Sequence, residues 1–485
     1  MIEMLLSLAI VTQDQIPLRA APTETAARHA SLSMGDNLEI RGVKGDYLQV
    51  YDYRRERGGY IRATQAGQYA LQAEEAPRLK AVVDFLKDQP GFEAMGVGHA
   101  AAFLKAAPVE AIDASLFEAI GKMADRLAWR ASKLSGSSGA ANEKQARTVD
   151  EHLDVLKSYG VTVYSVERNE KMTLCYDGEA WRRVMALPAT AEQKARAALS
   201  LTRHDCVQST LLPSERLELD LWRADLLDRA LEAGADGSLP GHLEARLKIR
   251  AAGVWAGIAH QMARRPDADA AVLKAGQTAE TMLAAVDKSL LVDGDVAAWN
   301  EAAIRVGASR WAKQTQVLPA PVKGRPGIRL AAGEQAGQNC VQVIEGENTP
   351  EQAPAFERCT YGQVWTSSLT VSPDGKLMTL AVQPLADWRE IWIFRLGSEG
   401  WEAEAVPPAV DQPELGYIEF AGWVPGNKQF LVARETFING VTKTSFELWN
   451  RETLKVEKRV DKPGNLTAFY RWQDPAWKSA TLAIR

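Results

Sequence analysis

Residues 9–64 alternate apolar and polar positions with a period of two, and turns interrupt the alternation. Leu38 and Ile40 alternate with polar neighbours, and Leu48 and Val50 alternate with tyrosines and a glutamine. Successive side chains of a strand point to opposite faces, so this period predicts short, half-buried β-strands.

Glycine-containing pairs divide these strands from one another. The Gly-Asp pairs at 35–36 and 45–46 predict two turns, and Gly-Gly at 58–59 predicts a positive-φ turn before the last strand. The apolar start is compatible with the end of an export signal or with a first strand. We favour a strand for 9–11 and leave 1–8 open.

Beyond these strands the apolar spacing changes to three and four residues, which predicts amphipathic helices. Thr190 and Gln193 form a predicted capping box, and Asp113 or Ser115 can cap an earlier helix. The alternating charges of 216–229 predict a solvated helix face with i,i+4 ion pairs. The predicted helical segments are 74–86, 98–105, 109–128, 143–159, 191–201, 213–234, 243–263, 268–290 and 296–312.

A small β unit and two linkers divide the helical part of the chain. Residues 161–166 and 172–176 predict a pair of strands, and 181–187 is a third strand or the start of a helix. The Ser/Gly-rich stretch 135–139 and the Pro/Gly-rich stretch 318–327 predict linkers. The predicted domains are 1–70, 71–134, 143–317 and 328–485.

The segment 9–64 resembles a bacterial SH3-type (SH3b) module. It contains an L-R-x-x-P opening strand, then G-D-x-L, G-D-Y-L-x-V and G-Y-I. The resemblance implies an SH3-like β-barrel that binds cell-wall peptide or protein segments along an aromatic groove. The candidate ligand-binding residues are Tyr47, Tyr51, Tyr53, Tyr60 and Arg55. The alternative is that two of the tyrosines pack the barrel and that 54–57 is a solvated loop.

The C-terminal part is predicted to be all β, and eight of the 14 tryptophans lie between Trp365 and Trp477. An S-P-D-G turn at 372–375, followed by an aromatic strand at 390–396, resembles a blade of a TolB-like β-propeller. About 155 residues hold two or three such blades, and a closed ring needs at least four. The prediction is therefore a partial propeller or a sandwich, and the whole chain is predicted to be a multidomain α+β protein with a helical middle.

Composition limits the partners. The 485 residues carry a net charge of -5 with a pI near 5.9, and nucleic-acid binders usually show a strong basic excess. We therefore expect no nucleic-acid partner. Apolar runs stay below the ~18–20 residues of a membrane span, so we expect no transmembrane segment.

The four cysteines form two pairs that are close in the sequence. Cys175 precedes Cys206, and Cys340 precedes Cys359, without any C-x-x-C spacing that would indicate zinc or redox chemistry. Two disulfides are one interpretation, and they favour a periplasmic or secreted protein. Four buried free thiols in a cytoplasmic protein are the alternative.

Catalytic signatures are lacking in the sequence. It contains no H-E-x-x-H, G-x-S-x-G or phosphate-binding loop, so we expect no catalytic residues, metal or cofactor. The run 203–206 (RHDC) favours a cysteine bridge beside a surface His-Asp pair over a nucleophilic site. Gly-Val-Gly at 96–98 lacks a preceding strand, which favours a loop between two helices over a dinucleotide site.

These patterns favour a non-catalytic, exported binding protein of the bacterial cell envelope. Its SH3b-like module would bind peptidoglycan or a protein partner. One alternative is an envelope hydrolase with its active site in the helical middle, which the module only targets. Another is an assembly scaffold that docks a partner through exposed tryptophans of the C-terminal part.

Overall fold

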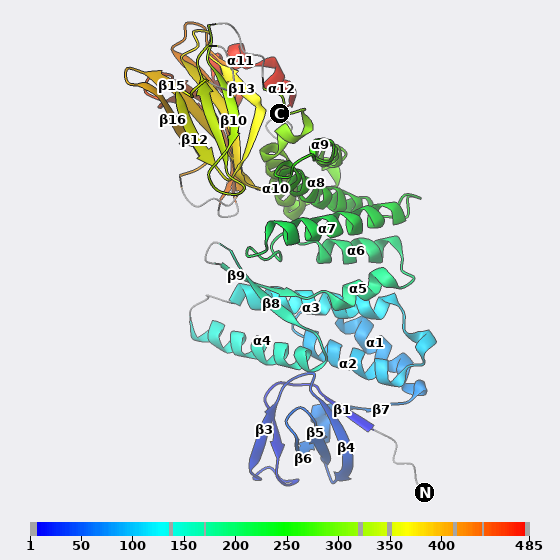
Figure 1. Ribbon diagram of the computed structural model, residues 1–485. Helices are drawn as coiled ribbons and strands as arrows, with labels where there is room; N and C mark the ends of the chain where they lie inside the picture. The colour runs from blue at the N-terminus through cyan, green and yellow to red at the C-terminus, as the bar shows by residue number, and fades with distance from the viewer. Residues whose placement is uncertain are drawn as a thin grey trace. The chain divides into compact units, whose positions relative to one another are not determined.

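The computed structural model describes residues 7–134, 139–168, 171–318, 324–346, 352–410, 415–438 and 441–480 (Figure 1). It divides into two compact units. The first contains residues 1–210 and 230–239, and the second contains 211–229 and 240–485. The mixed α+β architecture with an N-terminal sheet, a helical middle and C-terminal sheets is as predicted. Residues 143–317, predicted as one domain, contribute to both units.

Seven antiparallel strands form the N-terminal sheet, in the order β3-β2-β6-β5-β4-β1-β7. Apolar side chains on one side of the strands, among them Leu18, Leu38, Leu48, Val50 and Ile61, are buried in a common core. The predicted alternation and the predicted strand at 9–11 are confirmed. The strands are β1 (Ser7–Val11), β2 (Ile16–Arg19), β3 (Arg28–Leu32), β4 (Asn37–Lys44), β5 (Tyr47–Asp52), β6 (Arg57–Arg62) and β7 (Ala66–Ala70).

The predicted role of Gly58 and Gly59 is wrong. Both lie inside β6, and the left-handed residue of the preceding turn is Glu56, with φ 50°. Gly59 is required for a different reason. A Cβ atom there would lie 2.7 Å from the side chain of Leu18 and 2.8 Å from the carbonyl oxygen of Arg19. The glycine therefore permits close packing of β6 on β2.

Six helices and one hairpin complete the described part of the first unit. Asp113 caps α3 by accepting hydrogen bonds from the backbone of Ser115 and Leu116. The capping box of Thr190 and Gln193 is confirmed. The stretch 181–187, predicted as a third strand or the start of a helix, falls in helix α5 up to residue 186. Residues 135–138 of the predicted linker lie outside the described residues. The elements are α1 (Ala76–Leu86), α2 (Glu93–Ala106), α3 (Ala114–Leu134), α4 (Ala140–Ser158), β8 (Val163–Arg168), β9 (Lys171–Tyr176), α5 (Glu179–Ala186) and α6 (Ala191–Leu201).

Gly96 and Gly98 lie within α2, so the loop predicted there is wrong. A Cβ atom on Gly96 would collide with the sulfur of Met123, and one on Gly98 would lie 2.7 Å from the carbonyl oxygen of Gly35. The helix tolerates the two glycines because their missing side chains let α3 and the N-terminal sheet approach it closely. Tertiary packing thus outweighs their low helix propensity.

The described part of the second unit contains four long helices. The first of them, α7, belongs to the second unit up to residue 229, and its last residues belong to the first unit. The prediction of a fully solvated charged face on α7 is wrong in part. Asp220 and Arg223 are buried and joined at 2.6 Å, although Arg229 and Asp225 form the expected exposed i,i+4 pair. The helices are α7 (Pro213–Ala233), α8 (Gly241–Ala263), α9 (Asp269–Ala284) and α10 (Asp293–Ala308).

Strands of the second unit form a three-stranded sheet and an eight-stranded sheet. The larger sheet consists of two antiparallel meanders, β13–β16 and β17–β20. A short parallel pairing of β15 with β17 joins them. The strands are β10 (Gly327–Ala332), β11 (Asn339–Ile344), β12 (Phe356–Thr360), β13 (Gln363–Val371), β14 (Leu377–Leu385), β15 (Trp388–Gly397), β16 (Gly400–Val406), β17 (Leu415–Trp423), β18 (Gln429–Ile438), β19 (Val441–Asn450) and β20 (Val456–Val460).

Two short helices, α11 (Thr467–Trp472) and α12 (Pro475–Ala480), follow the last strand. Phe469 of α11 packs against Phe446, and Trp477 of α12 packs against Phe469. Both side chains are buried, so the end of the described chain is part of the core. Short 3-10 turns complete the description: η1 (Ala63–Gln65), η2 (Ala73–Glu75), η3 (Val109–Ala111), η4 (Lys288–Leu290), η5 (Arg310–Lys313) and η6 (Pro463–Asn465). None of the described helices combines the length and apolar character that a membrane span requires.

Candidate functional site

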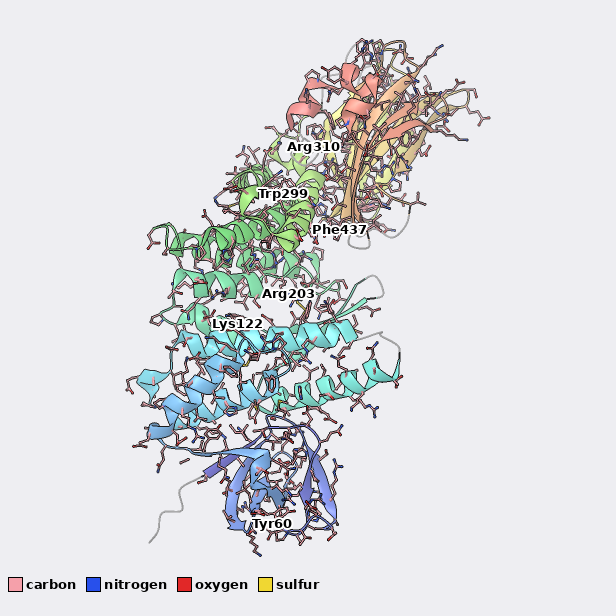
Figure 2. All side chains as sticks on the ribbon, turned by 180° about the vertical axis from the view of Figure 1, so that it is seen from behind. Tyr60, Lys122, Arg203, Trp299, Arg310 and Phe437 are labelled. Carbon is pink, nitrogen blue, oxygen red and sulfur yellow. A yellow bond between two sulfur atoms is a disulfide. The ribbon has the colours of Figure 1, made fainter. Side chains whose placement is uncertain are left out.

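Tyr47, Tyr51 and Tyr60 lie on one face of the N-terminal sheet, opposite the core. Tyr47 and Tyr51 alternate along β5 with buried Leu48, and Tyr60 of β6 pairs with Gln49 between them. Figure 2 shows Tyr60 on the side of the sheet away from the helices of the first unit. The structure therefore brings three of the five predicted ligand residues together on one surface.

A cation from β4 or β6 lies over each of these three rings. The guanidinium carbon of Arg41 lies 4.0 Å from the ring centre of Tyr51, and that of Arg62 lies 5.3 Å from Tyr47. The ammonium nitrogen of Lys44 lies 5.7 Å from the ring centre of Tyr60. Cations within about 6 Å of an aromatic face are attracted by its quadrupole. We call these six residues the tyrosine–cation face.

Tyr53 extends this surface beyond the end of β5. Its ring meets that of Tyr51 edge to face at 5.0 Å, and its hydroxyl donates to Glu39 at 3.0 Å. Glu39 also accepts a hydrogen bond from Arg41 at 2.9 Å, which lowers the pKa of this carboxyl below its usual value. Tyr53 is 66% exposed and Tyr47 only 7%, so the surface opens to solvent mainly at the Tyr53 end.

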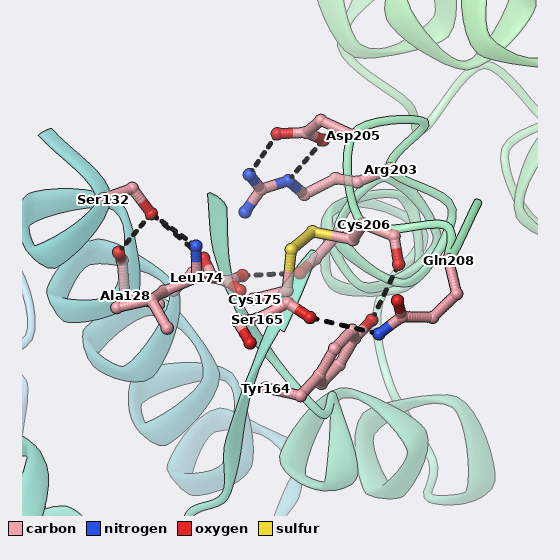
Figure 3. Close-up of a disulfide and its surroundings, with 12 residues drawn as sticks. Ala128, Ser132, Tyr164, Ser165, Leu174, Cys175, Arg203, Asp205, Cys206 and Gln208 are labelled. Atoms are coloured by element: carbon pink, nitrogen blue, oxygen red, sulfur yellow. Dashed lines mark hydrogen bonds and ion pairs between the residues drawn. A yellow bond between two sulfur atoms is a disulfide. The ribbon is translucent and has the colours of Figure 1, made fainter. Parts of the chain in front are cut away.

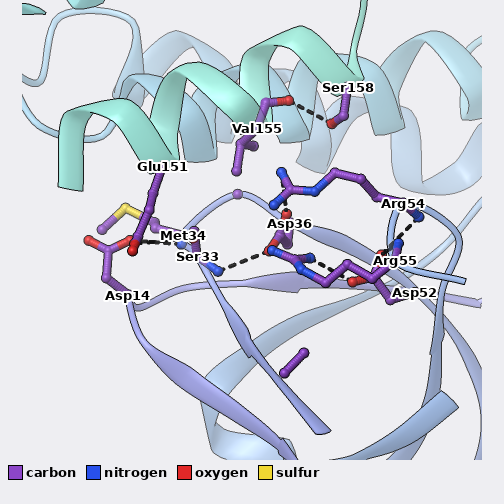
Figure 4. A network of polar contacts seen from close by, with 12 residues as sticks. Asp14, Ser33, Met34, Asp36, Asp52, Arg54, Arg55, Glu151, Val155 and Ser158 are labelled. Carbon is purple, nitrogen blue, oxygen red and sulfur yellow. Dashed lines mark hydrogen bonds and ion pairs between the residues drawn. The ribbon is translucent and has the colours of Figure 1, made fainter. Parts of the chain in front are cut away.

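Arg55 belongs to a different cluster. Its guanidinium pairs with Asp52 at 2.6 Å and with Asp36 at 3.0 Å (Figure 4). Burial lowers the pKa of Arg55, but the two carboxylates outweigh that effect and the net shift is upward. Arg55 therefore fastens the turn at 33–36 to the end of β5, and it does not join the tyrosines.

Helices of the first unit pack against this same turn. Figure 4 shows α4 passing over residues 33–36, where the hydroxyl of Ser33 donates to Glu151. His152 of α4 lies 2.9 Å from Asp14. Burial acts to raise the pKa of Asp14, but its hydrogen bonds to His152 and the Met34 backbone lower it. The helical region thus covers the turn, whereas Tyr60 of the tyrosine–cation face lies on the side of the sheet away from these helices.

Both predicted disulfides are formed. Cys175 of β9 is joined to Cys206, and the hydroxyl of Tyr164 donates to the carbonyl oxygen of Cys206 at 3.0 Å (Figure 3). Arg203 and Asp205 form a bidentate ion pair beside the bridge. Because its sulfur is bonded, Cys206 offers no thiolate, and the run 203–206 is a structural bridge as favoured from the sequence.

Cys340 and Cys359 face each other in the pairing of β11 with β12 and form the second bridge. Together with Glu357 they place three potential metal-ligating atoms within 4.8 Å of one another. A zinc site would need deprotonated thiols. Since both sulfurs are consumed by the disulfide, this cluster supplies no such ligands. Two disulfides are compatible with an exported protein.

Sequence reasoning missed a buried ionic cluster in the second unit. Glu419 of β17 accepts hydrogen bonds from Arg389 at 2.6 Å and from the indole of Trp477 at 2.7 Å, and Arg310 of η5 lies 2.8 Å away. Burial lowers the pKa of Arg389 to about 10, while Glu419 acts in the opposite direction. Arg389 also donates to the carbonyl oxygen of Gly307 at 2.8 Å, so its guanidinium has both Glu419 and this carbonyl as partners.

A cavity of about 230 Å³ adjoins this cluster. Its walls come from η5, β13, β14, β15, β17 and the start of α12, which lie far apart in the sequence. Neither spacing nor composition marks these residues, because serine, threonine and isolated arginines occur throughout the chain. The sequence therefore carries no signal that could have found this site.

Comparisons of the chain with protein-family models, with curated proteins and with solved structures gave no match. Function must therefore be argued from the geometry of the molecule alone. Two surfaces qualify: the tyrosine–cation face of the first unit and the cavity of the second.

Proposed function

We propose that the protein is a non-catalytic binding protein of the bacterial cell envelope and that its N-terminal sheet is an SH3b-like module. The observation that carries the proposal is the tyrosine–cation face, which is exposed mainly at its Tyr53 end, while the helices cover the turn at 33–36. Aromatic rings beside cations offer stacking surface and charge to a ligand that is partly apolar and partly anionic.

The charges of this face favour peptidoglycan over a neutral ligand. Arg41 is neutralised by Glu39, and Arg62 pairs with Glu24. Lys44 is exposed and has no ion-pair partner among the residues that the structure describes. Peptidoglycan stem peptides carry carboxylates, and sugar rings stack on tyrosines. We therefore propose the cell wall as the ligand and treat a protein partner as an outcome of the test.

Export follows from the same proposal. The two disulfides would persist in the periplasm or outside the cell, where the wall is accessible.

We also propose that the two meanders of the eight-stranded sheet correspond to two TolB-like propeller blades, supported by the turn at 372–375. There Arg451 donates to Asp374 at 2.6 Å. Burial acts to raise the pKa of Asp374, but this bond and one from Ser372 lower it to about 2.

A co-sedimentation assay of the full chain with purified peptidoglycan tests the proposal. We expect the wild type to sediment with the wall, and Tyr53→Ala together with Lys44→Ala to reduce retention about tenfold. Tyr470→Ala is the matched control, because Tyr470 is 71% exposed on α11 and outside this face. Retention of a purified envelope protein in place of the wall would support the protein-partner alternative.

The hydrolase alternative makes a different prediction for the same preparation. Release of muropeptides by the full chain, unchanged in the Tyr53→Ala, Lys44→Ala variant at high protein concentration, would show an active site elsewhere. The scaffold alternative has less support, because Trp365, Trp388, Trp392 and Trp449 are buried in the C-terminal core.

A further inference from the structure

The cavity of the second unit has walls of two kinds. Figure 2 shows Arg310 where the helices of this unit meet its β-sheets. Polar side chains form one part of the cavity wall, and apolar side chains form the rest of it. The lining residues on which the inference depends are Arg310, Trp311, Thr370, Thr379, Phe420 and Asp474.

Two buried donors of this wall take part in neither a hydrogen bond nor an ion pair in the described structure. They are the Nη1 of Arg310 and the Nε1 of Trp311. Arg310 is only 8% exposed, and its guanidinium lies 4.3 Å from the ring centre of Trp311. Leaving such donors unpaired away from bulk water costs free energy, so an acceptor that entered the cavity would be stabilised.

The paired hydroxyls of Thr370 and Thr379 supply one more donor. Their oxygens lie 2.7 Å apart, and only one hydrogen can lie between them. The other hydroxyl hydrogen is therefore available to a ligand. Neighbouring Ser368 is already committed, because its hydroxyl donates to Trp365 and accepts from the backbone of Ala381.

The charge of the wall favours an anion beside Arg310. Glu419 is shared by Arg310 and Arg389, so these three groups carry one net positive charge. Both oxygens of Glu419 already accept hydrogen bonds or ion pairs. Asp474 adds a carboxylate elsewhere on the wall. It would repel a second anionic group and attract an ammonium group.

The remaining wall is apolar and includes Leu380, Ala381, Ile391 and Phe420. A volume of 230 Å³ corresponds to roughly eight water-sized groups at about 30 Å³ each. We infer that this cavity binds a small organic monocarboxylate with an apolar side chain. Its carboxylate pairs with Arg310 and the Thr370–Thr379 hydroxyls. Amino acids such as leucine belong to this class, with their ammonium group toward Asp474.

Calorimetric titration of the full-length protein tests the inference with four probes. L-leucine and 4-methylpentanoate are expected to bind at one site and to raise the unfolding temperature. 3-Methylbutylamine, which lacks the carboxylate, and inorganic phosphate at matched ionic strength are expected not to bind. Binding of the amine equal to that of leucine, binding of phosphate alone, or no binding of either carboxylate would overturn the inference.

Variants locate the site. Thr379→Val is nearly isosteric and is expected to weaken binding about tenfold, and Arg310→Gln about a hundredfold. Arg395→Gln is the control, because Arg395 pairs with Glu402 and does not line the cavity. Wild-type affinity in both Thr379→Val and Arg310→Gln would exclude this cavity. If Arg310→Gln fails to fold, Thr379→Val and the probe series still decide the outcome.

Discussion

The hydroxyl of Tyr159 donates a hydrogen bond of 2.6 Å to the carbonyl oxygen of Gly35. This bond joins the end of the α4 segment to the turn between β3 and β4, residues 124 positions apart in the chain. Burial raises the pKa of Tyr159 well above its usual value, so the phenol stays a neutral donor at any physiological pH. The contact is a direct link between the N-terminal sheet and the helices of the first unit.

Replacing Tyr159 by Phe is expected to lower the free energy of unfolding by about 1–2 kcal/mol, because the carbonyl of Gly35 loses its buried donor. Urea unfolding, followed by fluorescence, measures the change. Tyr53→Phe is the control, since that hydroxyl is on the exposed surface and its loss should shift the midpoint little. Equal midpoints for the two variants would contradict the importance of the contact.

Gly35→Ala should be more harmful than Gly45→Ala, although both glycines have positive φ. Gly35 has φ 91°, and a Cβ atom there would lie 2.9 Å from the backbone nitrogen of Met95. Gly45 has φ 58°, and no atom lies within 4 Å of its virtual Cβ. We expect about 1 kcal/mol of backbone strain at Gly45. At Gly35 we expect several kcal/mol, because α2 must move. Comparable unfolding midpoints would show that the sheet is not packed closely on α2.

Removing the first disulfide by Cys175→Ser and Cys206→Ser is expected to destabilise the protein by about 3–4 kcal/mol. The bridge closes a loop with a sequence separation of 31, and its loss restores that freedom to the unfolded chain. Thermal unfolding measures the effect. Non-reducing peptide mapping of the wild type should show Cys175 linked to Cys206 and Cys340 linked to Cys359. Free thiols in protein from its native compartment would contradict export.

His260 should make the second unit sensitive to acid. Burial, together with nearby Arg264, lowers its pKa from 6.5 to about 4, so the folded state holds the ring neutral. The unfolded chain binds a proton below pH 6.5 and the folded protein only near pH 4. The stability linked to this histidine is therefore complete above pH 6.5 and falls as the pH decreases toward 4, by about 3 kcal/mol.

The His260→Gln variant isolates this contribution. Its unfolding free energy should fall less steeply than that of the wild type between pH 6.5 and 4. His242→Gln on the exposed start of α8 is a matched control and should keep the wild-type slope. Parallel curves for the wild type and His260→Gln would refute the assignment.

Glu435 should have the opposite dependence on pH. Its carboxyl is buried beside Tyr417, whose hydroxyl lies 2.9 Å away, and burial raises its pKa from 4.5 to about 7. Stability linked to this group is complete below pH 4.5 and is lost as the pH rises through 7. The unfolding free energy of the neutral variant Glu435→Gln should therefore rise by about 2–3 kcal/mol relative to that of the wild type as the pH increases from 5 to 8. A constant difference over this range in chemical unfolding would contradict the prediction.

Cysteine pairs provide one lesson about prediction from the sequence. Each pair lies within a short stretch of chain, so nearness in the sequence indicated which cysteines would pair, with four free thiols as the alternative. Arg55 shows the opposite case. It is next to the tyrosines in the sequence, but the turn after β5 directs it to Asp36 and Asp52, on the side that α4 covers. Sequence proximity at a turn does not determine the direction of a side chain.

Local signals alone determined the alternating strands around Leu38 and Leu48, the strand at 9–11 and the capping box at Thr190. They also limited the cap of α3 to Asp113 or Ser115, because each of these features depends on neighbours within a few residues. Tertiary structure alone decided why Gly59 and Gly98 are glycines, why Asp220 and Arg223 are buried, and where the cavity lies. In each case the deciding atoms come from a distant element, such as the carbonyl oxygen of Gly35 facing α2. Close packing of such elements follows from the fold and leaves no periodic trace in the chain.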